Sequence, residues 1–231
     1  MRTVGTVVRG IRTPIIKAND DLANIVVDSL LKAKENEGFE FKDKDVVAVT
    51  EAVIAISEGN YATVDDIAED IRRKFPNGDI GLVYPILSRN RFSIVLKGIA
   101  RACNHITMLL SFPNDEVGNG ILDEDLLYDN NYSLDSVISE EEYFKTFGSF
   151  LHPFTGINMV KFYKELVESE NCKIDFVFSN KPQTILEYKK DILVGSIHSR
   201  KRVKKILKNS NASAVLGLDD ILTEPINRKR L

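Results

Sequence analysis

The sequence predicts an α/β protein: an N-terminal α/β domain followed by a second α/β unit with a short parallel sheet. Short apolar runs alternate with segments that repeat apolar residues at helical spacing, and strands separated by helices pair in parallel. The composition, 43% hydrophobic and 28% charged with a net charge of −3, is typical of soluble globular proteins.

The composition also excludes several classes of protein. No apolar run approaches the ~20 residues that span a bilayer, and the N-terminus lacks the apolar core of a signal peptide. We therefore expect a cytoplasmic protein with no membrane partner, and the net charge argues against a nucleic-acid partner. Cys103 and Cys172 are far apart without metal-type spacing, so we expect them to be reduced and structural.

Strands and helices alternate in the first half of the chain. The run 45–54 is continuously apolar, which predicts a strand buried on both faces, with Glu51 at its exit from the core. Further strands are expected at 3–8, 80–86 and 105–112. Helices are expected at 21–35, where Leu22, Ile25, Val26, Leu30 and Ala33 form one apolar stripe, at 64–75 behind a Thr63–Asp66 capping box, and at 89–103.

An acidic stretch rich in Asn, Asp and Gly occupies residues 112–140. Long segments of this kind are either functional loops or boundaries. We therefore predict a domain over residues 1–118, an acidic connecting loop over 119–138 and a second α/β unit over 139–231.

The second half resumes the alternation. Ser139 and Glu142 form a capping box before a helix, Pro182 begins a short helix and Ser199 begins a basic one. Strands are expected in KIDFVFS, DILVGSIH and SAVLG, with an amphipathic helix in INMVKFYKELVESE. Ligands of parallel sheets bind beyond the carboxyl ends of the strands. This rule places six polar residues along one rim, namely Ser179, Asn180, His198, Ser199, Asp219 and Asp220.

Two polar clusters are candidates for binding. Ser88, Arg89, Asn90 and Arg91 follow a strand and precede a helix, where free backbone N–H groups and forked arginine donors suit an anion. The alternative is that these arginines only cap and solvate the helix. Asp115 and Glu116 follow the next strand, and adjacent carboxylates in such a turn suit Mg²⁺ or Mn²⁺, although the same residues are ordinary loop formers.

Three further features keep two interpretations each. Glu51 needs a partner, so it is either a ligand of a metal or an amine, or it forms a salt bridge with one of the arginines. His152, before Pro153, is either part of a rigid turn or catalytic. The basic segment 198–208 is either the solvent face of a helix or a phosphate-binding surface, and the tail 227–231 is expected to be a frayed end.

The first half resembles a known family. Its strand and helix starts, over about residues 3–118, resemble the N-terminal part of the coenzyme F420-0:L-glutamate ligase (F420-0 gamma-glutamyl ligase) family. The matching residues are Pro14, Asp20, Asp21, Leu22, Asp45, Val46, Val47, Val49, Thr50, Glu58 and Gly59. The segment 120–231 resembles an insertion in a divergent bacterial branch of ligase-like proteins.

The resemblance implies an amide ligase of coenzyme F420 biosynthesis. Such an enzyme uses GTP and Mg²⁺ or Mn²⁺ to activate a small-molecule carboxylate as an acyl phosphate, which the amine of an amino acid attacks. It implies that the turn at Thr13 and Pro14, with Thr50 and Glu51, lines the nucleotide site. We assign Ser88, Arg89, Asn90 and Arg91 to the same site as its anion clamp, and we expect a homo-oligomer. No catalytic residue is assigned.

The chain also departs from the family pattern. Two lysines of the family's TSKIVSK strand end are replaced by Ala52 and Ile56, and its metal-binding aspartate aligns with Ala100. The family's later metal motif is not found before Leu231, so we expect a continuation or another chain to supply it. These departures leave an alternative, a non-catalytic nucleotide- or phosphate-binding protein that retains the ligase fold. A third interpretation is an RNA- or phosphate-binding module built on helix 199–208.

Overall fold

The computed structural model describes residues 5–224, and the chain divides between Ala62 and Thr63 into two parts. We call Met1–Ala62 the N-terminal unit and Thr63–Leu231 the sheet unit. Within the described range, no helix is both long and apolar enough to cross a bilayer. Residues 3 and 4 of the first expected strand, and the basic tail 227–231, lie outside the described residues.

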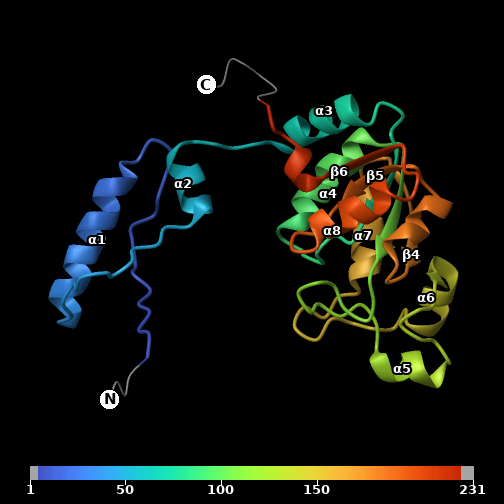
Figure 1. Cartoon of the computed structure of the whole chain (residues 1–231), viewed down its shortest axis with the longest axis horizontal. Helices are drawn as coiled ribbons and strands as arrows, with labels where there is room; N and C mark the ends of the chain where they lie inside the picture. The colour runs from blue at the N-terminus through green and yellow to red at the C-terminus, as the bar shows by residue number, and fades with distance from the viewer. Residues whose placement is uncertain (1–4, 225–231) are drawn as a thin grey trace. The chain divides into compact units, whose positions relative to one another are not determined.

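The N-terminal unit contains two helices, α1 (Leu22–Glu37) and α2 (Glu51–Ser57) (Figure 1). The side chain of Asp21 accepts a hydrogen bond from Asn24 N at 3.1 Å and so caps α1. The helix ends at Gly38, whose φ of 66° is left-handed and favours glycine. The expected apolar stripe lies along α1, and each of its five residues is partly buried.

The strand expected over residues 45–54 is wrong. Residues 45–50 form no strand, Val46 and Val47 are 87% and 57% exposed, and Glu51 is the first residue of α2. Residues 5–8 likewise form no strand. A strand needs a neighbour for its backbone hydrogen bonds, and the described residues of this unit provide none. The acid of Glu51 instead suits the positive end of a helix.

The sheet unit contains one six-stranded sheet in the order β3-β4-β2-β1-β5-β6. Neighbouring strands are parallel except β3, which pairs antiparallel with β4 at the edge. The mixed α/β fold predicted from the sequence is confirmed. The strands are β1 (Asp79–Val83), β2 (His105–Leu110), β3 (Ile138–Ser139), β4 (Lys173–Phe178), β5 (Asp191–Val194) and β6 (Ala214–Gly217).

Helices cover both faces of this sheet (Figure 1). On one face lie α3 (Val64–Lys74), α4 (Phe92–Ala102) and α7 (Met159–Glu168), and on the other lie α8 (Arg200–Lys208) and the 3₁₀ helix η1 (Pro182–Glu187). The connection from β2 to β4 holds α5 (Glu124–Asp129) and α6 (Glu140–Thr146), and η2 (Leu218–Asp220) follows β6. Both predicted capping boxes, at the starts of α3 and α6, are confirmed.

The chain does not divide within residues 119–138, where the sequence places a boundary. β2 precedes that segment and β4 follows it, yet the two strands pair over their whole length, from His105 opposite Lys173 to Leu110 opposite Phe178. Residues 63–118 and 139–224 therefore contribute to one sheet, and the acidic segment, including α5, is a connection within it. Backbone pairing between distant segments leaves no sign in local composition.

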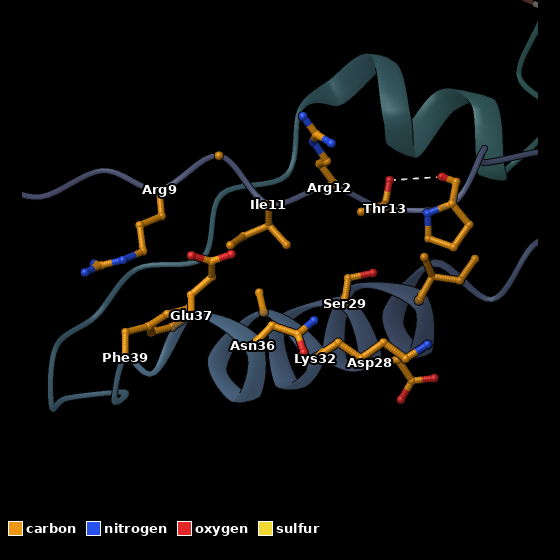
Figure 2. Close-up of a pocket in the computed structure, with 14 residues that line it drawn as sticks. Arg9, Ile11, Arg12, Thr13, Asp28, Ser29, Lys32, Asn36, Glu37 and Phe39 are labelled. Atoms are coloured by element: carbon orange, nitrogen blue, oxygen red, sulfur yellow. Dashed lines mark hydrogen bonds between the residues drawn. The ribbon is translucent and has the colours of Figure 1, made fainter.

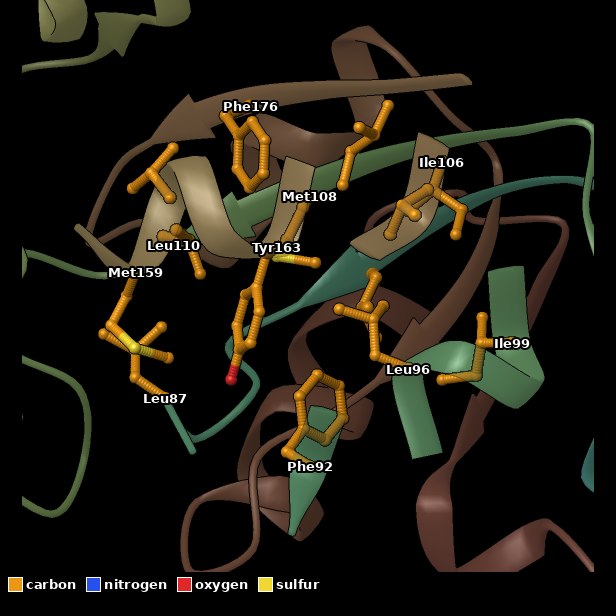
Figure 3. Packing of buried hydrophobic residues seen from close by; sticks show 14 of the residues in the cluster. Leu87, Phe92, Leu96, Ile99, Ile106, Met108, Leu110, Met159, Tyr163 and Phe176 are labelled. Carbon is orange, nitrogen blue, oxygen red and sulfur yellow. The ribbon is translucent and has the colours of Figure 1, made fainter. Parts of the chain in front are cut away.

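Two apolar clusters, one on each face, hold the sheet unit together. Successive strand residues alternate between them, as Leu82 and Val83 or Phe176 and Val177 show. The larger cluster contains the side chains that α4 and α7 direct onto the sheet (Figure 3). Both faces are thus buried, which explains why the strands read as continuous apolar runs in the sequence.

We predict that α4 contributes to stability through its sheet-facing side only. Ile99 is fully buried and Ile94 is 55% exposed on the same helix. Ile99→Ala should lower the free energy of unfolding by about 2–5 kcal/mol, because it leaves a cavity in the core. Ile94→Ala, the matched control, should change it by less than about 0.5 kcal/mol. Urea unfolding followed by circular dichroism measures both, and equal effects would contradict this packing.

Candidate functional site

The candidate site lies at the carboxyl edge of the sheet, where β1 and β5 are neighbours. The chain leaves β1 towards α4 on one face and leaves β5 towards α8 on the other. Parallel sheets bind ligands at such a switch point, between the two diverging loops. The loops are in close contact, because a Cβ on Gly195 would lie 2.9 Å from Pro85 Cα, so only glycine fits there.

Asp115, on the loop after β2, fastens that loop to the one after β1. Its carboxylate accepts hydrogen bonds from the amides of Leu87 (2.8 Å), Val117 (3.0 Å) and Asn119 (2.8 Å). The Asn119 side chain donates to Asp115 and to Leu87 O, at 2.8 and 3.3 Å. The sequence-predicted clusters at 88–91 and 115–116 are therefore brought together in space.

Tyr163 of α7 fixes the β1–α4 loop from the core side. Its hydroxyl accepts from Ser88 N at 2.7 Å, and burial raises the pKa of this phenol, so the hydroxyl stays neutral. Ser88 Oγ in turn accepts from Arg91 N at 3.1 Å. The loop backbone is held in place while its arginine side chains extend outwards.

Arg89 and Arg91 remain available to a ligand. Both are exposed at the start of α4, and neither forms an ion pair within residues 5–224. The first turn of α4 has no acidic residue and no side-chain cap. Two guanidinium groups at the positive end of a helix repel that end unless an anion is present. This geometry is consistent with the predicted anion-binding role.

Glu116, the neighbour of Asp115, contacts the loop on the other side of the edge. Its carboxylate accepts hydrogen bonds from three consecutive amides of the β5–α8 loop, those of Ile197, His198 (3.1 Å) and Ser199 (2.9 Å), and from Ser199 Oγ (2.8 Å). Burial alone would raise the pKa of Glu116, but these hydrogen bonds outweigh it and lower the pKa below its ordinary value. The carboxylate is thus held as an anion.

The start of α8 explains why an anion is bound there. Its first turn contains no acid, and the helix begins with Arg200, Lys201 and Arg202. Ser199 is the N-cap residue by position, but its hydroxyl donates to Glu116 and does not cap the helix. Glu116, from a loop more than 80 residues away, supplies the negative charge that the helix itself lacks.

Asp115 and Glu116 do not form a cation site as they stand. Each carboxylate accepts from N–H donors, and the two face different loops. Across the described residues, no group of three His, Cys, Asp or Glu side chains lies close enough to hold a metal ion. Metal binding by these two residues stays a prediction.

The other residues expected on this rim have structural partners. Asn180 bonds both backbone groups of Phe112, at 3.1 and 2.8 Å, and Ser179 Oγ lies 3.0 Å from Thr184 Oγ1. Asp219 and Asp220 pair with Arg200 and Lys204 of α8. Most polar residues of the rim therefore hold loops or helices together, whereas Arg89 and Arg91 face solvent.

In the N-terminal unit, Thr13 and Pro14 line a hollow of about 970 Å³ (Figure 2). Its walls are residues 9–14 and the face of α1 that carries Ile25, Ser29 and Ala33. The guanidinium of Arg9 lies 4.9 Å from the centre of the Phe39 ring at one end. Two of the four site residues predicted in this unit are thus on a concave surface.

The remaining predicted positions lie elsewhere. Thr50 and Glu51 are exposed at the start of α2 and do not line that hollow. Ala100, aligned with the family's metal aspartate, is fully buried in α4, where no ligand could reach it. His152 lies in a tight turn, in which its backbone N donates to Ile157 O at 2.9 Å and its Nδ1 accepts from Phe154 N at 3.3 Å.

Sequence reasoning missed the groups that make the edge a binding surface. Ile197, Asn119 and Tyr163 are absent from the predicted site. His198 and Ser199 are predicted on the rim, but no role is predicted for their backbone amides. A signal existed for the amides, since GSIHSRK places a glycine and two serines between a strand and a helix rich in basic residues. Tyr163 gives no such signal, because it resembles any core residue of an amphipathic helix.

The fold and the site define an α/β protein with anion-binding groups at the switch point of a parallel sheet. The family to which it belongs follows from comparison with known proteins. The model of the F420-0:Gamma-glutamyl ligase family matches residues 10–213, so the chain belongs to this family, as its N-terminal resemblance indicates. No curated protein and no solved structure matched the chain.

We predict a pH-dependent contribution of Glu116 to stability. Because its pKa is lowered in the folded state, the stabilisation is fully present above the ordinary glutamate pKa of about 4.3 and is lost as the pH falls through the lower folded-state value. Glu116→Gln should therefore lower the free energy of unfolding by about 1 kcal/mol at pH 7, and the difference should vanish near pH 3. Urea unfolding at several pH values measures it. Glu141→Gln, at an exposed position of α6, controls for loss of one surface charge, and a difference independent of pH would contradict the prediction.

Proposed function

We propose that this protein is a nucleotide-dependent amide ligase, which joins an amino acid to a small-molecule carboxylate in the manner its family name describes. The observation that carries the proposal is the family match over residues 10–213, which spans both the N-terminal unit and most of the sheet unit. A ligase-like function rests on that membership. GTP as the nucleotide, an acyl-phosphate intermediate and a role in coenzyme F420 biosynthesis are further steps of the proposal.

The proposed reaction has two balanced steps. A carboxylate oxygen of the acid attacks the terminal phosphorus of GTP, GDP leaves, and an acyl phosphate forms. The amine nitrogen of the amino acid then attacks the acyl carbon, inorganic phosphate leaves with the bonding electrons, and the nitrogen loses a proton. Both steps develop negative charge on phosphoryl oxygens, which positioned arginines and backbone N–H groups stabilise.

The geometry at the sheet edge supports this use of charge. Arg89 and Arg91 are unpaired within the described residues and stand on a loop that Asp115 and Tyr163 hold rigid. In the N-terminal unit, Thr13 and Pro14 line the hollow beside α1, and we propose this surface as a ligand-binding surface of that unit. Thr50 and Glu51, expected in the same site, begin α2 and stay a prediction. These residues bind and orient, and no proton-transfer residue is assigned.

The family implies Mg²⁺ or Mn²⁺, and the described side chains do not fit such an ion. Asp115 and Glu116 are engaged by N–H donors, and Ala100 replaces the family's aspartate. A homo-oligomer and a cytoplasmic location, both expected from the sequence, complete the proposal.

We predict that the arginines bind the nucleotide. Calorimetric titration with GTP, with and without Mn²⁺, should show binding, and the double variant Arg89→Ala/Arg91→Ala should weaken it about tenfold or more, since two charge-assisted contacts are lost. Arg73→Ala removes a surface arginine on α3, which is 56% exposed, and is the matched control. No GTP binding by the intact wild-type protein would contradict the ligase proposal.

A second candidate function is a non-catalytic binding protein that keeps the ligase fold. Three positions favour it. Ala52 and Ile56 stand where the resemblance places lysines, and the fully buried Ala100 stands where it places the metal-binding aspartate, so none of the three has a charged side chain. Assay of phosphate release from GTP in the presence of an acid and glutamate separates the two candidates. Binding without turnover supports the second, and phosphate release that depends on both substrates supports the first.

A further inference from the structure

The β5–α8 loop is an anion cradle that an anion of the chain itself already fills. Three consecutive amides and one hydroxyl, at Ile197, His198 and Ser199, converge on the two oxygens of Glu116. Convergent N–H groups at the start of a helix, after a strand at a switch point, are the arrangement that proteins use for phosphate groups. Here a carboxylate occupies the position that a phosphate would take.

A second observation comes from Ser196, the residue before the three amides. Its side chain is fully buried, and its Oγ has no hydrogen-bond partner among the residues that the structure describes. A buried hydroxyl without a partner costs about 1–3 kcal/mol, so its retention inside the loop needs a reason. A ligand oxygen beyond the two that Glu116 supplies would be such a partner.

The surroundings of the cradle permit an exchange of anions. Val117 and Ile197, which flank the contact, are 50% and 55% exposed, so the carboxylate lies close to solvent. Gly118, two residues after Glu116, is exposed with a φ of 88°, in a turn that Asp115 closes by accepting from Val117 N and Asn119 N. Asp115 remains anchored to Leu87 on the other side. Because the loop is held on both sides of Glu116, its side chain can leave the cradle by rotating about its own bonds while the loop stays in place.

We propose that the β5–α8 loop is a binding site for a phosphate group, and that Glu116 is its internal competitor. A phosphate offers more acceptor oxygens and more negative charge than a carboxylate, both of which suit a helix that begins with three cations. Phosphate can bind only while Glu116 is out of the cradle, so the apparent affinity for phosphate is the intrinsic affinity multiplied by the fraction of molecules with an empty cradle. The inference deepens the proposed function, because it assigns a phosphoryl position to the same edge of the sheet, and it rests on that function only for the identity of the ligand.

The test uses inorganic phosphate and the whole chain. Backbone amide resonances are followed by NMR during titration of the wild type and of Glu116→Ala. We expect Glu116→Ala to bind phosphate at least tenfold more tightly, with the largest shifts at Ile197, His198 and Ser199. Adding Ser199→Ala to that variant should weaken phosphate binding again, because one donor of the cradle is lost.

Controls keep the result interpretable. Glu141→Ala makes the same change in net charge at an exposed position of α6 and should bind phosphate like the wild type. If Glu116→Ala does not fold, Glu116→Gln, which keeps the side-chain length, replaces it with the same expectation. A folded variant whose phosphate affinity equals that of Glu141→Ala, or whose shifts lie outside residues 195–200, overturns the proposal.

A final arm separates this inference from the proposed function. GTP is titrated into Glu116→Ala in place of phosphate. Shifts at the same three amides identify a nucleotide as the source of the phosphate group and support both proposals. If inorganic phosphate shifts them and GTP does not, the cradle stands as a phosphate site and nucleotide binding there is overturned.

Discussion

The position of β1 in the sheet is the constraint on which the site depends. It lies between β2 and β5, and the helices that follow β1 and β5 cover opposite faces. At their carboxyl ends the two strands must therefore release their chains in opposite directions, and polar backbone groups are left at the point of divergence. The fold thus creates an excess of N–H donors at one place before any side chain is considered.

Negative charge from the β2–α5 loop satisfies that excess. Asp115 accepts from the loop after β1, and Glu116, its neighbour, accepts from the loop after β5. Two adjacent carboxylates thus bridge the two sides of the switch point. The sequence shows the pair and its place after a strand, and this pattern suggests a metal site, because carboxylates in an Asn/Gly turn suit hard cations. The structure shows that the donors they meet are amides, which depends on a segment some 80 residues away.

Features that depend on residues close together in the sequence could be predicted from it. Features that depend on pairing between distant segments could not. The capping boxes at Thr63 and Ser139 and the stripe of α1 depend on residues three or four apart, and they are present. The run 45–54 fails because an apolar stretch suits a strand or a helix until a neighbouring strand is known. The expected boundary at 119–138 fails for a related reason, since only the pairing of β2 with β4 shows that the sheet continues across it.

The charged residues that the family resemblance implies can be compared with those that this chain has. Family membership spans both units, whereas the cations and the aspartate expected from the family lie at positions that here carry Ala52, Ile56 and Ala100. Charge has instead accumulated at the sheet edge, on Arg89, Arg91 and the first turn of α8. On the proposal made above, an anionic ligand at the start of α8 would have to displace Glu116, whose lowered pKa keeps it charged at neutral pH. Binding at this edge would therefore be an exchange of one anion for another, and the two carboxylates would govern it: Asp115 by fixing the loop, and Glu116 by yielding its place.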